Sequence, residues 1–146
     1  MLGALKKLKN LSAETYQNHP LYRALEAYTA ELLELFETAE LDENWPNEFD
    51  LEELERHLLD AVSQLGVVLE LKIGQSRGEH VLELLGLSFN NFRIALNLLR
   101  NILLQGALQK DNLYLKKALY QFLRKGTKLE RILWKTLNEV SSNIKP

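Results

Sequence analysis

Residues 81–108 read VLELLGLSFNNFRIALNLLRNILLQGAL, and 17 of these 28 positions are apolar. A helix at the surface of a globular protein needs only about three apolar positions in seven to cover a core. The surplus predicts that this helix, expected over residues 77–106, buries more than one face. It is either the central helix of a bundle or an interface between copies of the chain.

Three further segments have the periodicity of amphipathic helices. Apolar residues recur at intervals of three and four near residues 20–40, 50–73 and 111–140. Pro20 suits the first turn of a helix, and Pro46 disfavours helical backbone at Trp45, so a break is expected between the first two segments. Each apolar stripe can be buried only against another. The sequence therefore predicts an all-α fold, an antiparallel four-helix bundle.

Capping residues mark the predicted helix ends. Two pairs have the spacing of a capping box, namely Asp50 with Glu53 and Ser76 with Glu79. Two glycines are expected to end the helices that precede them, namely Gly74 and Gly106.

The overall composition is that of one globular domain. The chain has 146 residues, of which 46% are hydrophobic and 26% charged, close to the averages of soluble domains. One domain is predicted over residues 1–146, with residues 1–19 as a short docking or flexible N-terminal segment and residues 141–146 as a frayed tail. No uncharged apolar run approaches the roughly 18 residues of a membrane span, so a cytoplasmic location without membrane contact is expected.

The sequence contains no constellation typical of catalysis or metal binding. It has no cysteine, which excludes a disulfide scaffold, a zinc–thiolate site and a cysteine nucleophile. Di-iron bundles need Glu-x-x-His on two helices, whereas Glu53 and His57 lie four residues apart and His80 precedes Glu83. There is no Gly-x-Ser-x-Gly elbow either. We expect a protein that is not an enzyme and that uses no metal, cofactor or small-molecule substrate.

The net charge of −2 conceals two oppositely charged halves. Residues 1–92 carry 17 acidic and 7 basic side chains, and residues 93–146 carry 3 acidic and 11 basic ones. Residues 26–60 alone hold 13 Asp and Glu, opposed only by Arg56. Such asymmetry indicates a charged partner, or attraction between the halves within one chain or between copies.

Basic residues of the last predicted helix share one side. At 100° per residue, they project within about 60° of one another, roughly opposite the apolar face of Phe122 and Leu133. We call them the basic ridge: Lys110, Lys117, Arg124, Lys128, Arg131 and Lys135. Tyr114, Tyr120 and Gln121 flank the ridge. A ridge of this kind matches a row of phosphates; the alternatives are an ordinary solvated face and a contact with the acidic segment 26–60 of another copy.

Two arginines and two tryptophans lie outside the basic ridge. Arg93 and Arg100 lie in a polar stripe on the third predicted helix, which is either its exposed strip or an extension of the basic surface. Trp45 is interpreted as a loop anchor rather than a ligand platform. Trp134 lies beside the apolar face of its helix, where core packing or an oligomer contact is expected.

Several of these segments resemble one protein superfamily. The Trp45-Pro46 turn with the long helix after it, the stretch LNLLRNILLQGAL and the late tryptophan in ILWKTL are similar to those of accessory variability determinant (Avd) proteins of diversity-generating retroelements. These are related to four-helix-bundle proteins encoded within 23S ribosomal RNA intervening sequences. The resemblance covers about residues 45–137. It implies a ring-like homo-oligomer without catalytic residues, a reverse transcriptase as partner, and RNA or DNA held by Lys117, Arg124, Lys128 and Arg131.

Two functions of different classes follow from the sequence. One is a non-enzymatic nucleic-acid-binding accessory protein that assists the reverse transcriptase of a diversity-generating retroelement. The alternative is a helical protein–protein interaction or assembly module with no nucleic-acid role. A homo-oligomer is expected in both cases, because the third helix is too apolar for one bundle to cover easily.

Overall fold

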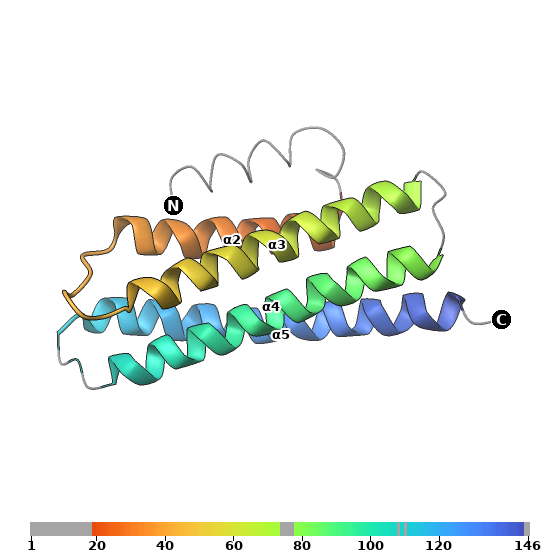
Figure 1. Cartoon of the computed structure of the whole chain (residues 1–146). Coiled ribbons are helices and arrows are strands. Elements are labelled where there is room, and N and C mark those ends of the chain that lie inside the picture. Colours follow the sequence, from red (N-terminus) through yellow and green to blue (C-terminus); the bar gives the residue numbers. More distant parts are fainter. Residues whose placement is uncertain (1–18, 74–77, 108, 110, 145–146) are drawn as a thin grey trace.

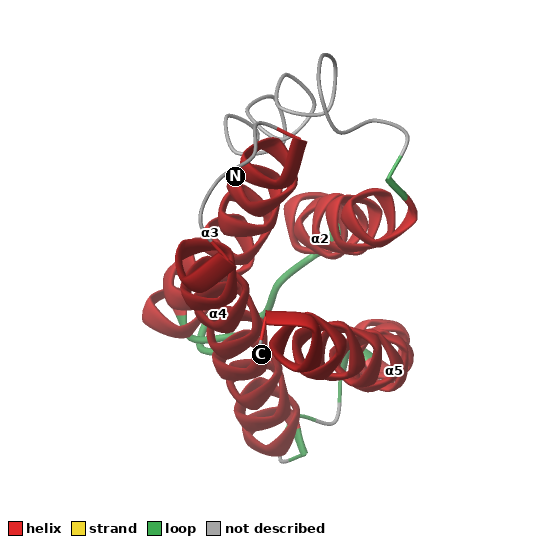
Figure 2. Cartoon of the chain, turned by 90° about the vertical axis from the view of Figure 1, so that its right-hand side faces the viewer, coloured by secondary structure: helices red, strands yellow, loops and turns green. Residues whose placement is uncertain are grey.

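The computed structural model describes residues 19–73, 78–107, 109 and 111–144, and these residues form four long helices (Figure 1). The helices are α2 (Pro20–Thr38), α3 (Glu48–Ile73), α4 (Gly78–Gly106) and α5 (Leu113–Ile144). Successive helices run in opposite directions (Figure 1). Seen end-on, they lie at four corners, so that α2 and α4 each pack against α3 and α5 (Figure 2). The predicted all-α four-helix bundle is confirmed.

The observed start of α3 corrects one predicted cap. The helix begins at Glu48, and Asn47 caps it, because Asn47 Oδ1 accepts a hydrogen bond from the backbone N–H of Asp50 at 3.3 Å. A side-chain oxygen at this place satisfies a donor that has no partner inside the helix. Asp50 and Glu53 therefore do not form the predicted capping box.

The other helix ends differ from the predictions by a few residues. α5 begins at Leu113, after Asn112, which has a positive φ of 68° and donates a side-chain hydrogen bond to the carbonyl of Glu40. It continues to Ile144, so residues 141–144 are helical rather than frayed. The predicted caps at residues 74 and 76 and the N-terminal segment 1–18 lie outside the described residues.

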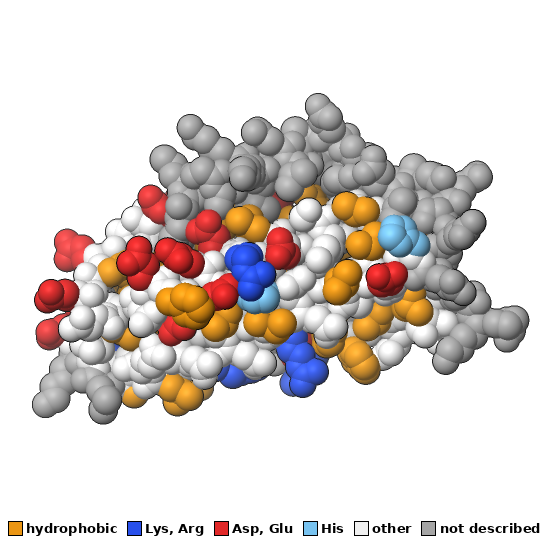
Figure 3. Space-filling view, in the orientation of Figure 1, with side chains coloured by type: hydrophobic (Ala, Val, Ile, Leu, Met, Phe, Trp, Pro, Cys, Tyr) orange, Lys and Arg blue, Asp and Glu red, His pale blue; other side chains and the backbone are white. Residues whose placement is uncertain are grey.

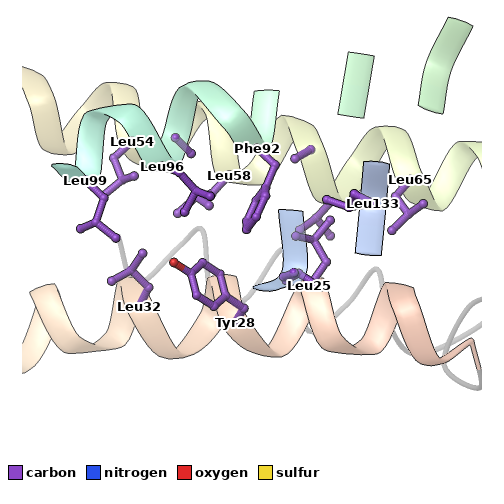
Figure 4. Close-up of a cluster of buried hydrophobic side chains, with 14 of the residues drawn as sticks. Leu25, Tyr28, Leu32, Leu54, Leu58, Leu65, Phe92, Leu96, Leu99 and Leu133 are labelled. Carbon is purple, nitrogen blue, oxygen red and sulfur yellow. The ribbon is translucent and has the colours of Figure 1, made fainter. Parts of the chain in front are cut away.

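The apolar helix α4 is a corner of the bundle and not its centre. Most of its apolar side chains are nevertheless buried, in a core that all four helices share (Figure 4). The buried ones are Val81, Leu85, Phe89, Phe92, Ala95, Leu96, Leu99 and Ile102. Three others are exposed to solvent, namely Leu87, Ile94 and Leu104. One bundle thus covers most of the surplus apolar surface of this helix, and these three side chains remain exposed.

Tyr28 joins α2 to α5 in the middle of the bundle (Figure 4). Its hydroxyl donates a hydrogen bond to the carbonyl of Phe122 at 2.8 Å, and its ring packs edge-on against Phe92 and Phe122. Gly126 allows this approach, since a Cβ there would lie 2.6 Å from the Tyr28 hydroxyl. Burial raises the pKa of the Tyr28 phenol because the phenolate would lose its hydration. Tyr28 therefore remains a neutral donor.

Trp45 closes the end of the bundle where α4 meets the loop before α3. Its side chain is 1% exposed, and its Nε1 donates a hydrogen bond to the carbonyl of Ile102 at 2.7 Å. The predicted loop anchor is confirmed. Gly106 lies directly against the indole, because a Cβ there would overlap two ring carbons and lie 2.8 Å from Nε1. No described glycine has a positive φ. Gly106 thus makes room for Trp45 and is not a left-handed helix cap.

Candidate nucleic-acid interface

The basic ridge lies on the solvent side of α5. Five of its members are described, and all five are exposed: Lys117, Arg124, Lys128, Arg131 and Lys135. Lys110 lies outside the described residues. Leu115, Leu119 and Leu133, which project about 180° away around the helix, are fully buried. From Lys117 to Lys135 the ridge follows one unbroken helix, which is about 27 Å at 1.5 Å per residue.

The ridge cations have no acidic partner within the described part of the chain. Ion pairs there join Arg56 to Glu53 at 2.8 Å and to Asp60 at 3.9 Å, and no described ridge side chain forms one. The hydrogen bond from Arg56, together with its charge, lowers the pKa of Glu53. Arg56, the one base of the acidic segment 26–60, is therefore already engaged, whereas the ridge is open to anions of a partner.

Neighbouring ridge residues repel one another. Arg124, Lys128, Arg131 and Lys135 follow at intervals of four, three and four residues, at which helical side chains are adjacent. Like charges at such spacing destabilise a helix by about 0.2–0.5 kcal/mol per pair. A row of phosphates between these side chains would replace repulsion with attraction.

Arg93 and Arg100 border the ridge on its α4 side. The rings of Phe89 in α4 and Trp134 in α5 lie 5.3 Å apart between centroids, and Leu96 of α4 lies against the position of Gly126. Arg93 and Arg100 each follow one of these two α4 contact residues by four positions, so they lie on the same edge of the helix. Arg93 is exposed, and Arg100 is half-buried and donates a hydrogen bond to Asn97. By helical geometry, both arginines therefore lie on the side of α4 that faces α5.

Three aromatic side chains are exposed along the edges of the ridge. Tyr114 is 77% exposed, Tyr120 60% and Trp134 51%. By their angular positions on α5, Tyr120 and Trp134 lie on the edge toward α4, and Tyr114 lies on the edge toward α2. Trp134 rests on Phe89 with half of its surface in solvent. Of its two predicted roles, core packing is therefore wrong, and an oligomer contact stays a prediction. The place of Trp134 on the ridge edge was missed because periodicity does not show which neighbour covers each side of a helix.

An acidic groove lies at another corner of the bundle. Its volume is about 520 Å³, and it runs between the loop after α2 and the first turns of α3. It is lined by Leu41, Asp42, Glu43, Pro46, Glu48, Leu51, Glu52 and Glu55. Acidic side chains gather at this end of the face that α3 and α4 form (Figure 3). Because α3 and α5 lie at opposite corners without direct packing in the described residues, the groove does not cover the ridge of its own chain.

The histidine considered for a metal site is used in hydrogen bonds. One ring nitrogen of His57 lies 2.8 Å from Asn91 Oδ1 and the other 3.1 Å from an Arg56 Nη atom. Since Arg56 can only donate, Nε2 of His57 accepts and Nδ1 donates to Asn91. In the described parts of the chain, no three His, Cys, Asp or Glu side chains are grouped to hold a metal ion.

Comparisons with protein-family models, with curated proteins and with solved structures found no match. Among the helices that the structure describes, none combines the length and hydrophobicity that crossing a membrane requires. The two charged surfaces of the bundle are therefore the features that bear on its function.

Proposed function

We propose that this chain is a non-enzymatic nucleic-acid-binding accessory protein whose basic ridge holds a phosphate backbone. The observation that carries the proposal is the row of five exposed cations on one face of α5, without an acidic partner among the described residues. Neutralisation of phosphates by such side chains supplies most of the non-specific affinity for nucleic acids. The resemblance to Avd proteins extends the proposal to a cytoplasmic homo-oligomer that assists the reverse transcriptase of a diversity-generating retroelement.

Charge reversal on the ridge tests this proposal. The test variant changes three ridge residues to Glu: Arg124, Lys128 and Arg131. A matched control reverses three exposed or half-buried cations that are not in the ridge: Arg23, Lys116 and Lys125. Both variants have the same net charge, so a difference between them reports the position of the charges and not their number. Circular dichroism checks that both remain helical.

Binding is measured by titrating labelled RNA and DNA at several salt concentrations. The ridge variant should lose affinity, and its plot of log affinity against log salt should flatten by about 0.7 units per lost contact on a single strand or 0.9 on a duplex. The control variant should retain most of the wild-type affinity and slope. Absence of binding by the wild type at low salt, or equal affinities of the two variants, contradicts the proposal.

The acidic groove supports a second candidate, a protein interaction module in which the ridge of one copy contacts the groove of another. Its acidic rim and its apolar residues Leu41, Pro46 and Leu51 complement a basic helix such as α5. A charge swap tests it. The first variant is the ridge variant defined above, and the second changes Glu43, Glu48 and Glu52 of the groove to Lys. Each variant alone should fail to self-associate, because its ridge and groove then carry the same charge. The two variants should associate with each other when mixed.

A further inference from the structure

We infer that the nucleic acid held by the basic ridge is single-stranded, with its bases stacked on Tyr120 and Trp134 at the edge of α5 that faces α4. The inference rests on the proposed function and adds the class of ligand and its orientation. It follows from the placement of exposed aromatic rings relative to the ridge cations.

Tyr120 is set among ridge cations. It follows Lys117 by three residues and precedes Arg124 by four, so its ring is adjacent to both on the helix surface, and 60% of its surface is in solvent. Base–aromatic stacking contributes about 1–3 kcal/mol per base and tolerates any sequence, because every base has a π face. In a duplex these faces are already stacked on neighbouring bases. Aromatic rings beside a row of phosphate-binding cations therefore add affinity only for a single strand, whose bases can stack on them.

Trp134 offers a second, more rigid platform on the same edge. Phe89 supports its ring at 5.3 Å between centroids with the planes tilted by 42°, and half of its surface is open. Trp134 follows Tyr120 by 14 positions, which corresponds to about 21 Å along the helix. Arg124, Lys128 and Arg131 lie between the two rings in the sequence. One strand can thus place its phosphates on the ridge and its bases on both rings.

The neighbouring helix favours the α4 edge for the bases. Arg93 and Arg100 border this edge, and guanidinium groups stack on bases as well as bind phosphates. The opposite edge faces α2, where one carboxylate, Glu31, and two ammonium groups, Lys125 and Lys128, line the groove between α2 and α5. None of these groups offers a planar cation on which a base could stack. Tyr114, which is exposed on that opposite edge, therefore provides a matched control for Tyr120.

The experiment compares Tyr120→Leu with Tyr114→Leu. Leucine retains apolar surface and helix propensity, so each variant removes an exposed aromatic ring with little effect on folding. The probes are labelled oligo(dT) and oligo(U) of about 20 nucleotides and a duplex of the same length, longer than the ~27 Å ridge at 3.4 Å per nucleotide. Tyr120→Leu should weaken single-strand binding roughly 5- to 150-fold, as expected for one lost stack. Duplex affinity and the salt dependence should not change, since no phosphate contact is lost.

Trp134 supplies an independent readout. The single strand should quench tryptophan emission of the wild type, and the quenching should disappear in Trp134→Phe, which retains a stacking ring but leaves only the buried Trp45 to report. Equal affinity of Tyr120→Leu and Tyr114→Leu for oligo(dT) and oligo(U) overturns the stacking inference. So does an equal loss on single strand and duplex. If the ridge variant loses all binding while Tyr120→Leu binds like Tyr114→Leu, the proposed function stands and only the stacking inference fails. The failure of one proposal is thus distinguishable from the failure of the other.

Discussion

Replacing Gly106 with alanine tests how the end of the bundle is closed. A glycine at the end of a helix is usually there for a left-handed backbone, but Gly106 does not have a positive φ. Its role is steric, because an alanine Cβ would overlap two carbons of the Trp45 ring. The indole cannot easily withdraw, since it is 1% exposed and its Nε1 is bonded to the Ile102 carbonyl.

The size of the effect can be bracketed from these contacts. If Trp45 shifts within its site, the cost is that of overpacking a core, about 1–3 kcal/mol. If the indole leaves the site, the cost approaches that of deleting a buried tryptophan, about 3–5 kcal/mol. We expect Gly106→Ala to reduce the free energy of unfolding by about 2–4 kcal/mol, between these limits.

Gly86 provides the matched control in the same helix. A Cβ there would meet nothing within 4 Å, so Gly86→Ala should stabilise the protein by up to about 1 kcal/mol through helix propensity. Urea unfolding followed by circular dichroism and tryptophan emission measures both variants. On a Trp45→Phe background the clash is relieved, and Gly106→Ala should cost much less. If Gly106→Ala is as stable as Gly86→Ala, the steric explanation is wrong.

Three further predictions concern single features of the bundle. Asn47→Ala should destabilise the protein by about 0.5–2 kcal/mol through loss of the α3 cap; a larger loss for Asp50→Ala in thermal melts would contradict this assignment. Tyr28→Phe should cost about 0.5–1.5 kcal/mol, the usual value of one hydrogen bond. Because the pKa of Tyr28 is raised by folding, the unfolded chain ionises first above pH 10, and wild-type stability should fall relative to Tyr28→Phe by about 1.4 kcal/mol per pH unit. Finally, light scattering should give a mass above the 16.9 kDa of one chain, because Leu87 and Ile94 leave apolar surface exposed on α4; a monomer at micromolar concentration would refute self-association.

The helices could be predicted from the sequence because their signals are local. Spacings of three and four residues showed the four helices to within a few residues, and the angular positions of the ridge residues predicted their exposure opposite Leu133. Asn47 and Asp50 were harder to distinguish. Both are capping types three residues apart, and the choice depends on the path of the loop at Pro46.

Features that join distant residues could not be predicted in this way. Tyr28 bonds to a carbonyl 94 positions away, and no local pattern links it to the glycine at position 126. Gly106 ends α4 as predicted, but its contact with Trp45 is visible only in three dimensions. The exposure of Trp134 depends in the same way on Phe89 of another helix.

The closed ring of helices also has a consequence for the order in which the fold assembles. α3, α4 and α5 follow one another as two helical hairpins, whose contacts are short in sequence and form early. The contact between α2 and α5 has the largest separation in sequence, since Tyr28 bonds to a carbonyl 94 residues away. Forming this contact therefore costs more chain entropy than forming either hairpin. The packing of α2 on α3 and α5 is also less extensive than that between α3 and α4. α2 should therefore dock last during folding and detach first during partial unfolding. Its amide hydrogens should exchange faster than those of α4. The basic ridge on α5 should keep its helical arrangement when α2 detaches.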